Sequence, residues 1–166
     1  MPDDIRKYIP LNSDEIQAKV MCKFMPYSQL YRCNSIEALL PKTLILYETK
    51  PKMGHFCCVF INSEGINFFD PYGIFPDDEL NKINNQRRRE THQEFAYLDR
   101  LLLEGKSSHS IIYNEYVYQS VGTSTCGKWC CVRLLYSDLH NDEFHDCFKG
   151  IKKELDIVIC DIYDNL

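Results

Sequence analysis

The sequence predicts one α+β domain over residues 1–166, with a central, mostly antiparallel sheet flanked by helices. The length of 166 residues is close to the usual size of a single domain and leaves no room for a second core. Hydrophobic residues make up 45% of the chain, enough for a buried core and too many for a disordered chain. Short apolar runs typical of strands accompany segments with helical apolar spacing, so both kinds of element are expected.

Each element expected in the first half rests on a local signal. Ser13-Asp14-Glu15 is a typical helix N-terminus. Several short apolar runs follow, and the last two are separated by Asn62-Ser63-Glu64-Gly65, a turn sequence that predicts a hairpin. Asp70-Pro71-Tyr72-Gly73 then ends the hairpin with turn-forming residues. The expected elements are a helix over 13–23 and strands over 43–49, 55–61 and 66–70.

The second half is expected to be mainly helical. Its first part is charged and periodic, which predicts one or two surface helices, and the Arg87-Arg88-Arg89 triplet there is interpreted as a solvated helix face. After Cys126 the apolar positions 130, 131, 134, 135 and 139 recur at helical spacing, which predicts a buried helix. The expected elements are surface helices over 77–104, a strand over 111–118, a helix from 126, a helix over 141–155 and a terminal strand over 157–162.

Composition excludes several classes of protein. Nine cysteines cannot all pair, and Cys57-Cys58 and Cys130-Cys131 are adjacent, where a disulfide is strained, so a reduced, intracellular chain is expected. The net charge of −5 is unsuited to general nucleic-acid binding. The acidic, polar start resembles no secretory signal, and every apolar run is far shorter than the roughly 20 residues of a membrane span. A soluble protein without membrane contact is therefore expected.

Cys126 is the first candidate for chemistry. Ser124 and Thr125 are plausible N-cap residues, which would put Cys126 in the first turn of a buried helix. The positive end of the helix dipole favours a thiolate at that position. Gly127 beside it would let another chain, such as a substrate, approach closely. A lone cysteine is more often a small core residue, so the assignment depends on its companions.

Three further residues complete the candidate site. A hairpin with a two-residue loop puts His55 and Asp70 on the same face, diagonally opposed and about 7–8 Å apart at Cα. Asp70 could then orient the His55 imidazole as a base for a thiol. Gln119 is expected to end the aromatic strand seven residues before Cys126, and its amide is a suitable donor to an oxyanion.

The order and spacing of these residues resemble those of the adenovirus maturation protease (adenain) and the related SUMO-specific, Ulp-type proteases. The resemblance implies a papain-related adenain/Ulp-like cysteine protease fold. It also implies a role for each residue: Cys126 as nucleophile, His55 as general base, Asp70 as orienting acid and Gln119 as oxyanion donor. It covers roughly residues 40–140. The motifs that carry it are Gly54-His55, Phe69-Asp70-Pro71-Tyr72-Gly73, Gln119 and Ser124-Thr125-Cys126-Gly127-Lys128-Trp129-Cys130-Cys131.

The same resemblance implies a function. It implies an endopeptidase that processes viral capsid precursor proteins during virion maturation in a DNA virus or virophage. Its expected place is the host cytoplasm or viral factory, with packaging in the virion, and its expected form is a monomer without cofactor or metal. An activating peptide is a further partner that the resemblance allows. DNA is not expected as a partner, because the net charge is −5.

Three alternatives remain open from the residues alone. The first is a zinc site, although structural zinc usually shows paired Cys knuckles and only Cys126-x₃-Cys130 comes near that pattern. The second is a non-catalytic interaction domain, against which the complete set of four site residues argues. The third keeps the chemistry but acts on host conjugates, as a deubiquitinase or SUMO isopeptidase. The potential zinc ligands are His55, Cys57, Cys58, Cys126, Cys130, Cys131, His140 and His145.

Overall fold

Five strands form one mixed sheet in the structure, a computed structural model that describes residues 2–50 and 53–166. Their order in the sheet follows the chain. The β2–β3 and β3–β4 pairs are antiparallel, whereas β1 and β5 run parallel to their neighbours. The sheet is therefore mixed rather than mostly antiparallel, because helical connections bring the outer strands back in the same direction. The strands are β1 (Lys23–Pro26), β2 (Lys42–Lys50), β3 (Met53–Asn62), β4 (Gly65–Phe69) and β5 (Ile111–Tyr113).

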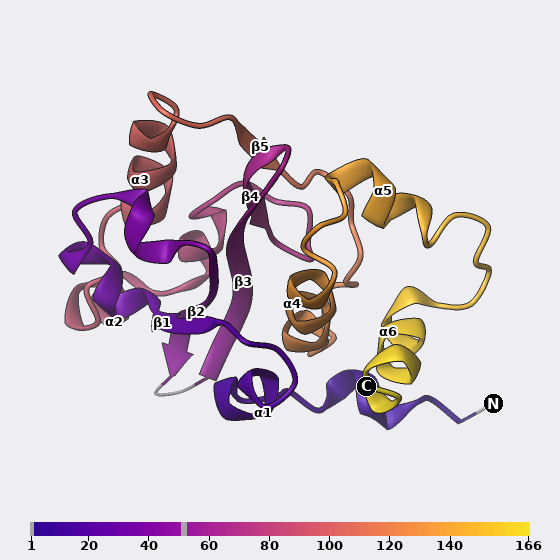
Figure 1. Ribbon diagram of the computed structural model, residues 1–166. Helices are drawn as coiled ribbons and strands as arrows, with labels where there is room; N and C mark the ends of the chain where they lie inside the picture. The colour runs from indigo at the N-terminus through magenta and orange to yellow at the C-terminus, as the bar shows by residue number, and fades with distance from the viewer. Residues whose placement is uncertain (1, 51–52) are drawn as a thin grey trace.

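Helices cover both faces of the sheet, which explains the continuous apolar runs of β2 and β3 (Figure 1). Leu44 and Cys58 belong to the core on one face, and Ile45 and Cys57 to the core on the other. The first face is covered by α1 (Ser13–Gln17), α4 (Cys126–Leu135), α5 (Asn141–Asp146) and α6 (Leu155–Asp164). The second is covered by α3 (Tyr97–Gly105) and the 3-10 helices η2 (Tyr27–Arg32), η3 (Ile36–Leu39) and η4 (Asp78–Lys82).

Three predictions are confirmed: the hairpin, the buried helix that begins at Cys126 and the helices of the charged segment. β3 and β4 pair from Asn62–Gly65 onward, so the loop holds two residues, as expected. The buried helix begins at Cys126. The charged segment forms η4, α2 (Asn85–Glu90) and α3, and α2, which carries the arginine triplet, buries none of its residues.

Two predicted elements have the wrong type or extent near the ends of the chain. The helix expected over 13–23 ends at Gln17, and the chain enters β1 at Lys23, a strand that the sequence analysis did not predict. The terminal strand expected over 157–162 is wrong, because those residues lie within helix α6. β-branched residues at 157–159 suggested a strand. The buried positions 156, 159, 160 and 163 instead follow helical spacing.

Two other elements are shorter than expected. The strand expected over 111–118 stops at Tyr113, because the buried Asn114 amide donates to the carbonyls of Asp70 and Tyr116 and turns the chain out of the sheet. The helix expected over 141–155 ends at Asp146, before Gly150 adopts a left-handed backbone with φ of 77°.

The first residues of the chain lie against α6 (Figure 1). The 3-10 helix η1 (Ile5–Tyr8) carries Arg6, whose guanidinium lies 2.8 Å from the carboxylates of both Asp161 and Asp164. These partly exposed ion pairs tie the amino-terminal segment to the last helix. Within the described ranges no helix combines the length and the apolar character needed to span a bilayer.

Candidate active site

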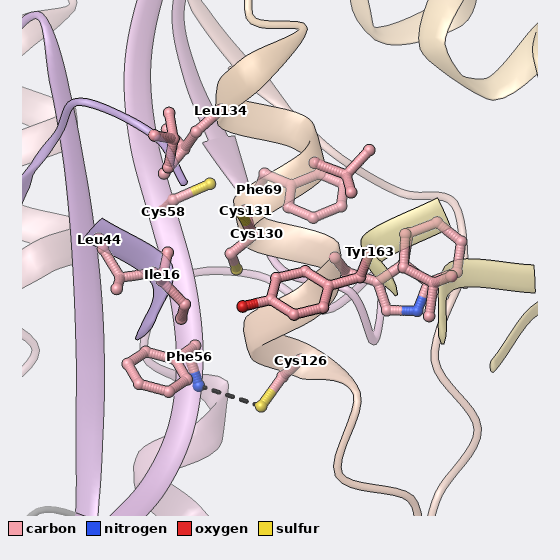
Figure 2. Packing of buried hydrophobic residues seen from close by; sticks show 14 of the residues in the cluster. Ile16, Leu44, Phe56, Cys58, Phe69, Cys126, Cys130, Cys131, Leu134 and Tyr163 are labelled. Atoms are coloured by element: carbon pink, nitrogen blue, oxygen red, sulfur yellow. Dashed lines mark hydrogen bonds between the residues drawn. The ribbon is translucent and has the colours of Figure 1, made fainter. Parts of the chain in front are cut away.

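The site lies where the β3–β4 ladder ends. The last pair of that ladder is Cys58–Phe69, because Asp70 leaves the strand for the Asp-Pro-Tyr-Gly turn. The amino-terminal end of α4 approaches β3 at this point. The Phe56 amide N–H donates to the Cys126 sulfur at 3.5 Å, as Figure 2 shows. A backbone N–H directed at this sulfur is suited to holding it in place and to stabilising negative charge on it.

His55 and Asp70 meet across the hairpin as the register predicts. The His55 Nε2–H donates to Asp70 Oδ1 at 2.9 Å, and the two residues are only 5% and 1% exposed. The Tyr72 amide donates to the same carboxylate oxygen at 2.9 Å, which holds the acid in place. Gly54 lets β2 approach the start of β3, because a Cβ there would lie 1.7 Å from the Tyr47 carbonyl oxygen.

The surroundings of His55 favour its protonated form. Burial by itself lowers the pKa of His55. The Asp70 carboxylate and the interaction with the Cys126 sulfur outweigh that cost, so the pKa of His55 is raised well above the ordinary 6.5. Because His55 Nε2 is hydrogen-bonded to Asp70, Nδ1 is the ring nitrogen that remains to exchange a proton with the Cys126 thiol. An imidazole oriented by a carboxylate, in a cleft that a cysteine also lines, is the arrangement that activates a thiol nucleophile.

Tyr72 is a site residue that the sequence analysis did not identify. Its ring stacks on the His55 imidazole with centroids 4.6 Å apart and an interplanar angle of 16°. Burial raises the pKa of its phenol to about 12, so the hydroxyl stays protonated at neutral pH. The Asp-Pro-Tyr-Gly turn was the available signal, since a turn that positions the acid also positions the residue two places later.

Gln119 reaches the site from a loop, not from the end of a strand as expected. Its backbone N–H donates to the Pro71 carbonyl at 3.0 Å, which ties this loop to the turn that carries Asp70. Its side chain is buried, and Nε2 donates to the Thr123 carbonyl at 3.0 Å and lies 3.5 Å from the Tyr72 hydroxyl. One N–H of the amide is therefore engaged within the loop, and the second makes only a weak contact.

The start of α4 differs from the expectation in two ways. Thr125 occupies the N-cap position, but its hydroxyl donates to Asp156 at 2.5 Å and caps no helix N–H. The space beside Gly127, expected to admit a substrate, is filled by the chain itself. A Cβ on Gly127 would lie 3.1–3.3 Å from atoms of Leu11, Ile16 and Phe56. The glycine allows the amino-terminal segment, rather than a ligand, to pack against the helix.

A cleft of about 510 Å³ opens over these residues. His55, Cys126 and Gln119 line it together with Tyr72. Residues 10–12 of the amino-terminal segment line the same cleft. The cleft is large enough to receive an extended peptide segment, and the three predicted residues with reacting or donating groups border the same space.

Comparison with known proteins relates this chain to a viral protein. No family model matches it. Over 124 residues it is 36% identical to "Uncharacterized protein V9" of the Sputnik virophage, and the match covers 71% of this chain and 70% of that protein. The chain belongs to the family of this virophage protein. The relation supports the virophage affinity expected from the sequence, and since the relative's name states no activity, the chemistry rests on the site itself.

The remaining cysteines of this virophage-family protein are distributed through the molecule. All nine lie in the described part of the chain and are free thiols. Cys57, Cys58, Cys130 and Cys131 are fully buried in the core, as expected for small apolar residues around the site. Figure 2 shows Cys130 and Cys131 beyond Cys126 along α4. In residues 2–50 and 53–166, no three His, Cys, Asp or Glu side chains are grouped as a metal site requires, so the zinc alternative has no ligand cluster there.

Proposed function

We propose that this protein is a cysteine endopeptidase, with an adenain/Ulp-like fold, that cleaves viral structural precursor proteins during virion maturation. The observation that carries the proposal is the buried hydrogen bond of the His55 imidazole to the Asp70 carboxylate, in a cleft that Cys126 also lines. A nucleophile, a base and an acid that orients the base are the groups that acyl transfer requires.

The proposed reaction proceeds by covalent catalysis. The Cys126 sulfur, having given its proton to His55, attacks the scissile carbonyl carbon and forms a tetrahedral intermediate. The C–N bond then breaks as the His55 imidazolium gives its proton to the departing amine. His55 next accepts a proton from water, whose oxygen attacks the thioester and releases the acid and the free thiol. Asp70 stabilises the imidazolium at each stage.

Two N–H groups are proposed to stabilise the oxyanion. One is the backbone N–H of Cys126, in the first turn of α4, where helix N–H groups have no partner within the helix. The other is the N–H of the Gln119 amide that makes only a weak contact. Gln119 and Cys126 both line the cleft. Donors fixed before the reaction lower the barrier without reorganisation.

The substrate class rests on two supports. The first is the similarity of the site residues and their order to those of the adenovirus maturation protease. The second is the family relation to a virophage protein. The resemblance further implies a preference for small residues such as glycine just before the cleaved bond. A reducing compartment, either host cytoplasm or viral factory, keeps a thiol nucleophile active.

The proposal is tested by co-expressing the chain with the major capsid protein from the same genome and mapping new termini by mass spectrometry. Cys126→Ala should abolish the new termini and leave the fold intact. Cys130→Ala, which also removes one buried sulfur from α4, is the matched control and should retain cleavage. Near wild-type cleavage by Cys126→Ala would refute the assignment of the nucleophile.

A second arm tests the substrate class. Fluorogenic ubiquitin and SUMO substrates are supplied to the wild-type protein and to Cys126→Ala. The proposal expects no turnover of either conjugate at concentrations where the capsid protein is cleaved. If Cys126-dependent turnover of a conjugate is seen without capsid cleavage, the proposed chemistry is supported but the substrate class is wrong. The substrates would then be host conjugates.

A further inference from the structure

A carboxylate outside the triad contacts the segment that connects the two oxyanion donors. Asp156 lies in the first turn of α6 and is 0% exposed. It accepts hydrogen bonds only from residues 120–125, here termed the oxyanion loop, in the described part of the chain. The donors are the Ser120 N–H at 3.1 Å, the Thr123 hydroxyl at 3.2 Å and the Thr125 hydroxyl at 2.5 Å.

These contacts reach both ends of the oxyanion loop. Ser120 directly follows Gln119, and Thr125 directly precedes Cys126. Asp156 Oδ2 accepts from the first of these residues and Oδ1 from the second, so one rigid carboxylate spans the loop. In the middle of the loop, the carbonyl of Thr123 accepts from the Gln119 amide at 3.0 Å. The backbone beside each oxyanion donor is thereby tied to the same side chain.

The energetic cost of this arrangement points to a function. A carboxylate buried without a cationic partner is expensive, and here hydrogen bonds from the loop compensate for it together with the positive end of the α6 dipole. A core position of this kind would be more stable with an apolar residue if packing were the only requirement. A loop held by a buried acceptor has fixed backbone geometry, which is what donors to a transient oxyanion need.

We infer that Asp156 is a positioning residue that sets the distance between the Gln119 amide and the Cys126 N–H for oxyanion binding. The inference rests on the proposed function, because it assigns Asp156 to the stabilisation of the tetrahedral intermediate. It predicts that weakening the contact lowers the rate of the chemical step and leaves formation of the thiolate unaffected. His55 and Asp70, which generate the thiolate, make no hydrogen bond to Asp156 in the described part of the chain.

The sharpest test compares Thr125→Val with Thr125→Ser. The valine replaces the hydroxyl by a methyl group of similar size, whereas serine keeps the donor to Asp156. Thr125→Val should lower kcat about 10- to 100-fold for a peptide spanning the mapped cleavage site, with KM changed less than about twofold. Thr125→Ser should restore kcat to within about threefold of wild type. The pH profile of Cys126 alkylation by iodoacetamide should be the same in all three proteins.

Asp156→Asn provides a second variant should Thr125→Val fail to fold, and it should lower kcat in the same way. Asp161→Asn removes a half-buried carboxylate from the same helix and should leave kcat unchanged. Equal losses in kcat and in the alkylation rate would overturn the inference, because they would indicate a general structural defect. An unchanged kcat in both Thr125→Val and Asp156→Asn would also overturn it.

Failure of the proposed function can be distinguished from failure of this inference. If the wild-type protein cleaves no substrate, the proposed function fails, and amide hydrogen exchange over residues 119–126 still tests the positioning contact. Thr125→Val should accelerate exchange in that segment relative to Thr125→Ser, while exchange in β3 stays constant. Equal exchange in the two variants would show that Asp156 does not hold the loop.

Discussion

Stability should fall as pH rises through the titration of Asp77, a buried carboxylate between two tyrosines. Its Oδ1 accepts hydrogen bonds from the Tyr27 and Tyr47 hydroxyls at 2.7 and 3.2 Å, and its Oδ2 accepts from the Asp99 N–H at 2.8 Å. Burial nevertheless raises its pKa from 3.8 to about 6. The folded protein therefore holds a proton on this carboxyl at pH values where the unfolded chain has lost it.

The magnitude follows from that difference in pKa. A rise of about two pKa units corresponds to about 3 kcal/mol at about 1.4 kcal/mol per unit. Because the folded state binds the proton more tightly, the stabilisation is present below about pH 4 and is lost as pH rises to about 6 and beyond. By neutral pH, ionised Asp77 costs the folded state about 3 kcal/mol relative to its protonated form, and a little under half of this loss falls between about pH 5 and pH 7.

The assay is urea unfolding of the wild type and of Asp77→Asn from about pH 4 to about pH 7. Asparagine can accept from the tyrosines but not from the Asp99 N–H, so the variant loses a roughly constant amount at every pH. The advantage of wild type over the variant should shrink by about 2 kcal/mol as pH rises over that range. Other carboxylates titrate equally in both proteins and cancel. An advantage that is constant, or that grows with pH, would refute the reasoning.

Three further predictions concern the site. Asp70→Asn should lower the pKa of His55 and move the alkaline limb of kcat/KM to lower pH, because the imidazolium loses its buried counter-ion; NMR titration of the ring measures this, and an unchanged titration would contradict it. Tyr72→Ala should reduce kcat more than Tyr72→Phe, because phenylalanine keeps a ring stacked on His55. Steady-state kinetics measures both losses, and equal losses would contradict this prediction. Gly54→Ala should destabilise the fold by about 1–3 kcal/mol or more in urea unfolding, since a Cβ there overlaps the Tyr47 carbonyl; wild-type stability would rule out the close approach.

Sequence reasoning succeeded where the physical cause is local. A two-residue turn determines the register of a hairpin, and the two-residue period of a strand then places His55 and Asp70 on one face. The helix that starts at Cys126 was likewise readable from its apolar spacing alone. Both depend on neighbours within a few residues, so no knowledge of the rest of the fold was needed.

Predictions failed where packing against distant segments decides the outcome. Ile157 and Val158 have a high intrinsic preference for strands. The segment is nevertheless helical, because a helix packs the face that includes Ile159 into the core. β1 is a strand because it pairs in parallel with the edge of β2. The pattern of a segment of only four residues does not predict such a pairing. The sequence identifies Gln119 as a site residue but wrongly places it at the end of a strand. It lies in a loop whose position depends on the hydrogen bond from the Gln119 N–H to the Pro71 carbonyl.

The sequence by itself determined the chemical groups of the candidate site, their order and the pairing of His55 with Asp70. Only the tertiary structure brought Cys126 to the end of the β3–β4 ladder, closed one wall of the cleft with the amino-terminal segment and placed Asp156 against the oxyanion loop. The physical reason is the separation along the chain. Turn and helix signals act over a few residues, whereas these contacts join segments far apart in the sequence, and only collapse onto a shared core selects among them.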